Sequence, residues 1–125
     1  GYNAPPGGDV PIQIEHTNQA DVLQIAIHDR RLDARAAPDL KAALASFVGV
    51  GWQWIVLDIS RVEFIDSSAL GAIVSGLKLL GRSGDLVIAG AQPPVVALFG
   101  LTRMDKVFRL FPSVADATAA LTSRV

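Results

Sequence analysis

Short apolar runs alternate with amphipathic segments of helical length along most of this chain, and that alternation limits the folds open to it. Three of the runs, at residues 22–27, 52–59 and 86–89, have the length and composition of strands. The middle run is apolar on both faces, which is typical of a central strand covered on each side. Strands that alternate with helices favour a mostly parallel sheet with right-handed crossovers.

Four helices are expected: residues 35–48, residues 66 to about 80, a short helix from Pro93 to about Gly100, and a last one capped by Ser113. Apolar residues recur at helical spacing in the first two, so each has one face directed to the core. These stripes are Leu40, Leu44 and Phe47 in the first helix, and Leu70, Ile73, Val74 and Leu77 in the second.

The N-terminal part predicts a β-hairpin. Residues 12–15 alternate apolar and polar side chains, and turn-forming residues occupy 18–21 before the strand at 22–27. A final strand is expected at 107–111. The predicted fold class is therefore α/β: one domain with a mixed, mostly parallel sheet, an N-terminal antiparallel edge strand and about four helices.

Length and composition narrow the functional classes. The chain has 125 residues, half of them apolar, a net charge of −1 and no cysteine. These features predict one well-filled domain at residues 10–125, after a flexible leader rich in Gly and Pro at residues 1–9. Without a basic stripe or a long apolar segment, neither nucleic acid nor a membrane is expected as a partner. No metal or cofactor is expected, and the chain is predicted to be cytoplasmic.

The residues with the clearest chemical signal are Asp66, Ser67 and Ser68, between a buried strand and a helix. Asp and Ser are the types that cap helix N-termini, where their oxygens accept bonds from free backbone N–H groups. One cap needs only one acceptor, yet three stand in a row. A phosphate on a serine there would be tolerated by its own helix, whose N-terminus favours anions. It would disrupt an interface packed over it, so the predicted switch acts between molecules.

The stretch from Val62 to Gly71 (VEFIDSSALG) resembles the signature of STAS domains, the anti-sigma factor antagonists of bacteria. Residues 31–34 (RLDA), with Pro38 and Leu40, look like the family's loop before its first helix, and residues 101–108 look like its late segment. The resemblance spans roughly residues 10–121. Ala69 and Arg31 stand where many members have glycine.

The resemblance implies a binding module, not an enzyme. Its partner would be an anti-sigma factor that is also a serine kinase of the ATP-binding, histidine-kinase-like type. Phosphorylation of Ser68, with Ser67 as the fallback acceptor, would release the partner, and a phosphatase would reset the switch. The implied partner-binding residues are Asp33, Asp66, Ser67, Ser68, Ala69 and Gly71.

Two other functions stay open. STAS domains also occur as scaffold subunits of larger complexes, such as stressosomes, and with transporters and lipid-transport systems; the oligomeric state is not predicted. Asp58, at the end of a buried strand, resembles the phosphate-accepting Asp of receiver domains. A receiver needs an acidic pair after its first strand, whereas residues 28–31 contain one acid among basic residues.

Overall fold

The computed structural model describes residues 12–124, so the predicted leader at residues 1–9 lies outside the described residues. The strands are β1 (Ile14–Gln19), β2 (Val22–Ile27), β3 (Arg31–Leu32), β4 (Trp54–Asp58), β5 (Phe64–Ile65), β6 (Asp85–Ala89) and β7 (Leu110–Phe111). The helices are α1 (Ala37–Gly49), α2 (Ser67–Leu80), α3 (Pro93–Leu101) and α4 (Val114–Thr122), and a short 3₁₀ helix, η1, covers Met104–Lys106.

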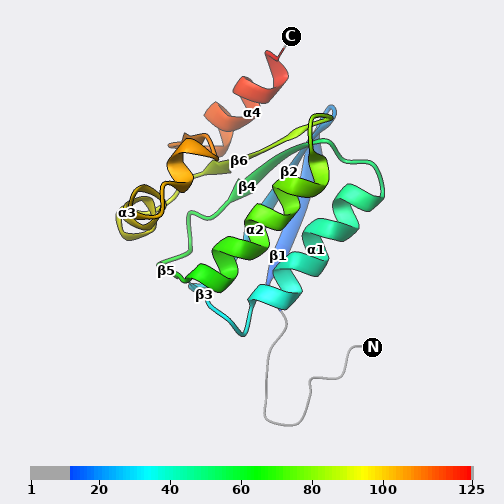
Figure 1. The fold of residues 1–125 in the computed structure, drawn as a ribbon. Coiled ribbons are helices and arrows are strands. Elements are labelled where there is room, and N and C mark those ends of the chain that lie inside the picture. Colours follow the sequence, from blue (N-terminus) through cyan, green and yellow to red (C-terminus); the bar gives the residue numbers. More distant parts are fainter. Residues whose placement is uncertain (1–11, 125) are drawn as a thin grey trace.

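The main sheet has five strands in the order β1-β2-β4-β6-β7 (Figure 1). β1 pairs with β2 in antiparallel orientation, and all the other neighbours in this sheet are parallel. From β2 onward, strands that follow one another along the chain in this sheet are also neighbours in it. Each connection contains one α-helix, and the connection from β6 to β7 also contains η1. The predicted α/β class, the antiparallel edge strand and the four helices are confirmed.

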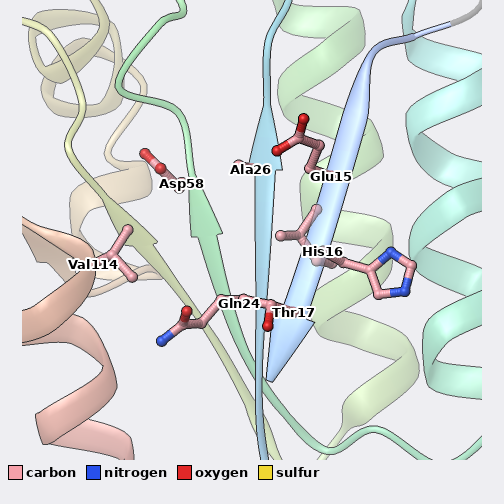
Figure 2. Close-up of a pocket in the computed structure, with 8 residues that line it drawn as sticks. Glu15, His16, Thr17, Gln24, Ala26, Asp58 and Val114 are labelled. Carbon is pink, nitrogen blue, oxygen red and sulfur yellow. The ribbon is translucent and has the colours of Figure 1, made fainter. Parts of the chain in front are cut away.

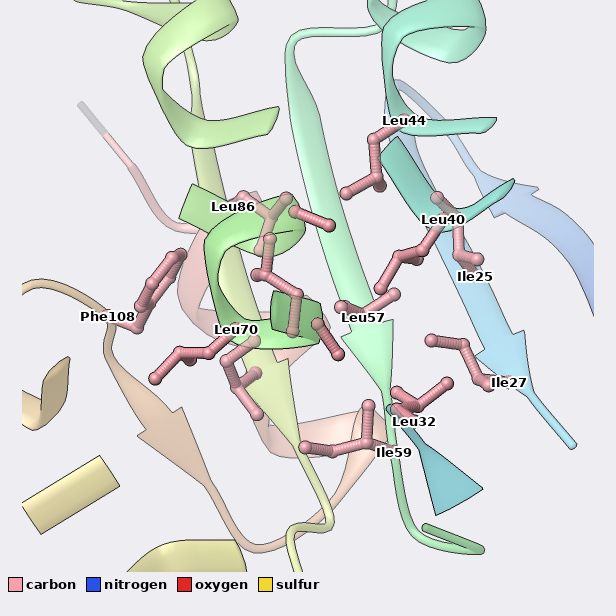
Figure 3. Packing of buried hydrophobic residues seen from close by; sticks show 14 of the residues in the cluster. Ile25, Ile27, Leu32, Leu40, Leu44, Leu57, Ile59, Leu70, Leu86 and Phe108 are labelled. Carbon is pink, nitrogen blue, oxygen red and sulfur yellow. The ribbon is translucent and has the colours of Figure 1, made fainter. Parts of the chain in front are cut away.

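Helices cover both faces of the sheet. α1 and α2 lie side by side on one face, and the larger core cluster fills the space beneath them, including Leu40, Leu44 and Leu57 (Figure 3). α4 covers the other face through Ala117 and Leu121. Ser113 caps α4 as predicted, because its Oγ accepts the N–H of Asp116 at 3.1 Å. No helix in residues 12–124 is long and apolar enough to cross a membrane.

α1 and α2 approach each other closely because Gly76 has no side chain. A Cβ at this position would lie 2.9 Å from Cδ1 of Leu44 on α1. That approach sets the two helix N-termini next to each other at one end of the sheet (Figure 1).

The two edge strands of the main sheet differ from the sequence prediction. The first strand begins at Ile14 and continues to Gln19, because Asn18 and Gln19 pair with β2 and the turn is confined to Ala20 and Asp21. The strand expected at 107–111 is reduced to Leu110–Phe111. Phe108 instead turns into the core against Phe99, with 6.1 Å between ring centroids, so residues 107–109 do not join the sheet.

β3 and β5, each of two residues, were not predicted. They form a separate parallel two-stranded sheet with Arg31 opposite Phe64 and Leu32 opposite Ile65. In the prediction, the first of these segments was part of a connection without regular structure.

Candidate functional site

The small β3–β5 sheet brings together two loops that are far apart in the sequence. Asp33 follows β3 directly, and Asp66 follows β5 directly. Because Leu32 and Ile65 are partners, and the N–H of Asp66 donates to the carbonyl oxygen of Leu32 at 3.0 Å, the two aspartates follow neighbouring strand ends. The loops predicted to form the site therefore meet at one end of the molecule.

Asp66 is the N-cap of α2. Its Oδ1 accepts the N–H of Ala69 at 3.0 Å, and its carbonyl oxygen accepts the N–H of Leu70 at 3.0 Å. The side chain is half-buried, so the cap fixes the direction in which α2 leaves β5. Capping occupies one carboxylate oxygen and leaves both serine hydroxyls unused for this purpose.

Ser67 and Ser68 are the first two residues of α2, and both are exposed. Ser68 lines an open hollow of about 520 Å³ between the first turns of α1 and α2. The other lining residues are Ala34, Ala37, Pro38, Lys41, Gly71 and Ala72. The Ser68 hydroxyl is thus accessible from solvent, within a concave and mostly apolar surface.

Lys41 is the only basic residue that lines this hollow. It belongs to α1, and it forms no ion pair with any of residues 12–124. Lys41 and the α1 residues around it were not predicted as site residues. The signal for them was the three-residue spacing of Pro38 and Lys41, which places both on one side of the helix expected after the Asp33 loop.

Asp33 holds its own loop in shape. Its Oδ1 accepts the N–H of Arg35 at 3.0 Å, and its carbonyl oxygen accepts the N–H groups of Ala36 and Ala37, each at 3.0 Å. Its Oδ2 lies 4.0 Å from Nε of Arg31. The Arg31 guanidinium in turn lies over the ring of Phe64, 4.3 Å from its centroid. An ion pair and a cation–π contact therefore link the Asp33 loop to β5.

Gly71 and Ala69, both predicted to bind the partner, differ in their exposure to solvent. Gly71 is exposed on the outer side of α2 with open space around it. Ala69 is fully buried, because the third residue of α2 faces the core. The Ala69 side chain is therefore not part of the exposed surface, and its role in partner binding stays a prediction.

Substitution of Asp66 separates its capping role from any role of its charge. Asp66→Ala is expected to lower the free energy of unfolding by about 1 kcal/mol, because the Ala69 N–H loses its acceptor. Asp66→Asn should leave stability nearly unchanged, because Asn caps as well as Asp. Chemical denaturation of both variants measures this. Equal losses for the two would show that the carboxylate charge, rather than the cap, stabilises the helix.

A second hollow, of about 160 Å³, lies on the sheet face away from α1 and α2 and includes Asp58 (Figure 2). Oδ1 of Asp58 accepts the N–H of Ser60 at 3.0 Å, as expected for a residue that shapes a turn. The other carboxylate there is Glu15 of β1, on a different strand. Within residues 12–124 no group of three His, Asp or Glu residues could hold a metal ion. The surroundings of Asp58 therefore give no support to the receiver interpretation.

Two features define a class of domain. One is the α/β fold with an antiparallel edge strand, and the other is the serine pair at the start of a second helix capped by Asp66. Residues 12–117 match the STAS domain family. Because that match covers most of the chain, the chain belongs to the STAS domain family.

Its relatives include proteins named for one function. A Thermotoga maritima protein, provisionally named an anti-sigma factor antagonist, is 32% identical over 72 residues, which are 57% of this chain and 64% of that protein. The chain thus spans less than two thirds of that relative. The anti-sigma-B factor antagonist of Staphylococcus aureus is 28% identical over 92 residues, 73% of this chain and 84% of that protein.

A solved structure agrees with these sequence relatives. The crystal structure of an anti-sigma factor antagonist from Mycobacterium paratuberculosis superposes with a TM-score of 0.83 at 26% identity. The match covers 98% of this chain and 100% of that one.

Proposed function

We propose that this chain is an anti-sigma factor antagonist: it binds an anti-sigma factor that is also a serine kinase, and phosphorylation of Ser68 releases that partner. The observation that carries the proposal is the exposed Ser68 hydroxyl, in an apolar hollow at the capped N-terminus of α2. The names of the sequence relatives support the class of partner. By sequestering the anti-sigma factor, the unmodified chain would free a sigma factor for transcription.

The electrostatics of the hollow support a switch that leaves the fold intact. A phosphate on Ser68 would add about −1.5 to −2 charges. In the free chain, this charge would be stabilised by the helix N-terminus and by the nearby Lys41, and solvated by water. In a complex, a partner packed over the hollow would remove that water. Lys41 supplies only one positive charge against about −1.5 to −2 on the phosphate, so part of the phosphate charge would be desolvated without a counter-charge, and binding would weaken.

The role of the chain is to bind rather than to catalyse. The kinase activity belongs to the proposed partner, and a separate phosphatase would restore the Ser68 hydroxyl. Sigma factors act in the cytoplasm, so the antagonist would act there too.

The test uses the purified chain and each kinase-type anti-sigma factor encoded in the source genome. At least one is expected to bind the unmodified chain tightly. Addition of ATP and Mg²⁺ should dissociate that complex. Mass spectrometry of the released chain should detect one phosphate, on Ser68. Binding to none of these proteins would overturn the proposed function. Modification of Ser67 alone would move the switch to the neighbouring residue.

A further inference from the structure

α3 is an exposed helix without a polar face. None of its nine residues, PPVVALFGL, carries a polar side chain. Val95 and Phe99 point into the core, whereas the surface side carries Pro93, Pro94, Val96, Ala97, Gly100 and Leu101. Leu101 is 84% exposed. Surface helices normally direct polar residues to water, so an apolar outer side indicates a surface that contacts something other than water.

Exposed apolar residues continue from α3 toward the site. Val107, just after η1, and Phe64 of β5 are both exposed, and η1 and β5 both pack against α3. Among residues 12–124, those with large exposed apolar side chains are Val50, Phe64, Leu79, Val96, Leu101 and Val107. Four of these six belong to β5, α3 and the segment after η1, so they gather in one region.

This region adjoins the phosphorylation site. Phe64 precedes the capping Asp66 by two residues. The guanidinium of Arg31, which forms an ion pair with Asp33, lies over the Phe64 ring. Figure 1 shows α2 with the start of α1 on one side and β5 and α3 on the other. β5, with Phe64, therefore lies between the N-terminus of α2, which carries Ser68, and α3.

We propose that the outer side of α3, with Phe64 and Val107, is the second half of the surface that binds the anti-sigma factor. The inference rests on the proposed function and adds to it where that partner docks and with what chemistry. The partner would place its kinase site over the Ser68 hydroxyl and an apolar surface over α3.

The size of the hollow argues for such an extension. A stable protein–protein interface uses about 20 to 30 residues on each side, whereas seven residues line the Ser68 hollow. The partner must therefore also cover a neighbouring element. The outer side of α1 is mixed, with Asp39, Lys41 and Ser46 exposed, whereas that of α3 is uniformly apolar. Burial of apolar surface is the main favourable term in association, so α3 is the better candidate.

The decisive experiment compares Leu101→Asp with Val50→Asp. Both replace an exposed apolar residue by the same charge, but Val50 follows α1 at the end away from the hollow. The probe is the anti-sigma factor that binds the wild-type chain most tightly in the test above. Leu101→Asp is expected to weaken its affinity by at least about tenfold, as for a buried contact at the centre of an interface. Val50→Asp should change it less than about twofold.

Hydrogen exchange gives a readout without mutation. The amides of residues 95–101 should exchange more slowly in the complex than in the free chain. Wild-type affinity of Leu101→Asp together with unchanged exchange on α3 would overturn the inference. The proposed function would survive that result if Ser68→Glu still released the partner.

The same variants distinguish two other binding partners for the outer side of α3, a second copy of the chain and a lipid surface. Unchanged affinity of Leu101→Asp for the anti-sigma factor, together with loss of self-association in sedimentation, would assign α3 to a second copy. Loss of binding to phosphatidylglycerol vesicles, again without an effect on the anti-sigma factor, would assign it to a lipid surface. Either result would overturn the inference.

Discussion

Ser68→Glu is expected to weaken binding to the anti-sigma factor by at least about a hundredfold. The substitution places a permanent charge in the hollow between α1 and α2, where a docked partner would exclude water. A buried charge without a partner costs about 3 to 5 kcal/mol, and each 1.4 kcal/mol is a factor of ten in affinity. Lys41 in the same hollow would offset part of this cost, so the expected loss lies at the lower end of that range. Titration calorimetry with the purified partner measures the change directly.

Ser68→Ala is the matched variant. It removes the hydroxyl without adding a charge, so we expect it to bind about as tightly as the wild type and to stay bound after ATP is added. Ser67→Glu tests the position, because Ser67 is also exposed but is not among the residues that line the hollow. Unchanged affinity in Ser68→Glu would contradict the proposed switch.

The thermal stability of Ser68→Glu should stay close to that of the wild type. A negative side chain in the first turn of a helix is stabilising by about 0.3 to 1 kcal/mol. Lost affinity in a folded variant would therefore reflect the interface rather than unfolding. A large fall in its melting temperature would instead mean that the hollow cannot accept charge even in the free chain.

Gly84→Ala is expected to have the largest effect on stability. A Cβ at Gly84 would lie 1.8 Å from the carbonyl oxygen of Gln53 and 2.7 Å from its carbonyl carbon. Both are backbone atoms of Gln53. Gln53 directly precedes Trp54 of β4 and Gly84 directly precedes Asp85 of β6, and these two strand residues are paired. Neither backbone can therefore move without separating β4 from β6. We expect a loss of more than about 3 kcal/mol, seen as a fall of roughly 10 °C in melting temperature.

Gly71→Ala is the control for that experiment. A Cβ there meets no atom within 4 Å, and the position lies inside α2. Alanine is the better helix former by about 1 kcal/mol, so this variant should be slightly more stable than the wild type. If Gly84→Ala melted at the wild-type temperature, the close approach of β4 and β6 would not constrain the fold as we describe.

The elements with long and consistent patterns could be predicted from the sequence. β2 was predicted with its observed bounds, and α2 was predicted to run from the serine pair to about Leu80. Both combine periodic apolar residues with a clear start signal, Asp66 in the case of the helix. The turn residue Asn18 was misleading, because pairing with β2 overrides the local preference and Ala20 takes the left-handed conformation.

The arrangement of the site was less predictable. A two-residue strand is too short to show any alternation, so β3 and β5 gave no signal, although they bring the Asp33 and Asp66 loops together. The burial of Ala69 depends on how α2 rotates against the core, which follows from packing. Lys41 enters the hollow only because α1 and α2 lie side by side. Contacts between distant segments are absent from any local pattern.

The two edge strands of the main sheet determine whether copies of the chain can pair edge to edge at high concentration. β1, at one edge, exposes every residue from Glu15 to Gln19, all of them polar or charged, and β7, at the other, has two residues followed by Pro112. Polar or very short edge strands give a neighbouring chain little to extend. Copies of this domain should therefore resist amyloid-like stacking at high concentration, and larger assemblies would have to be held together by helices rather than by a shared sheet.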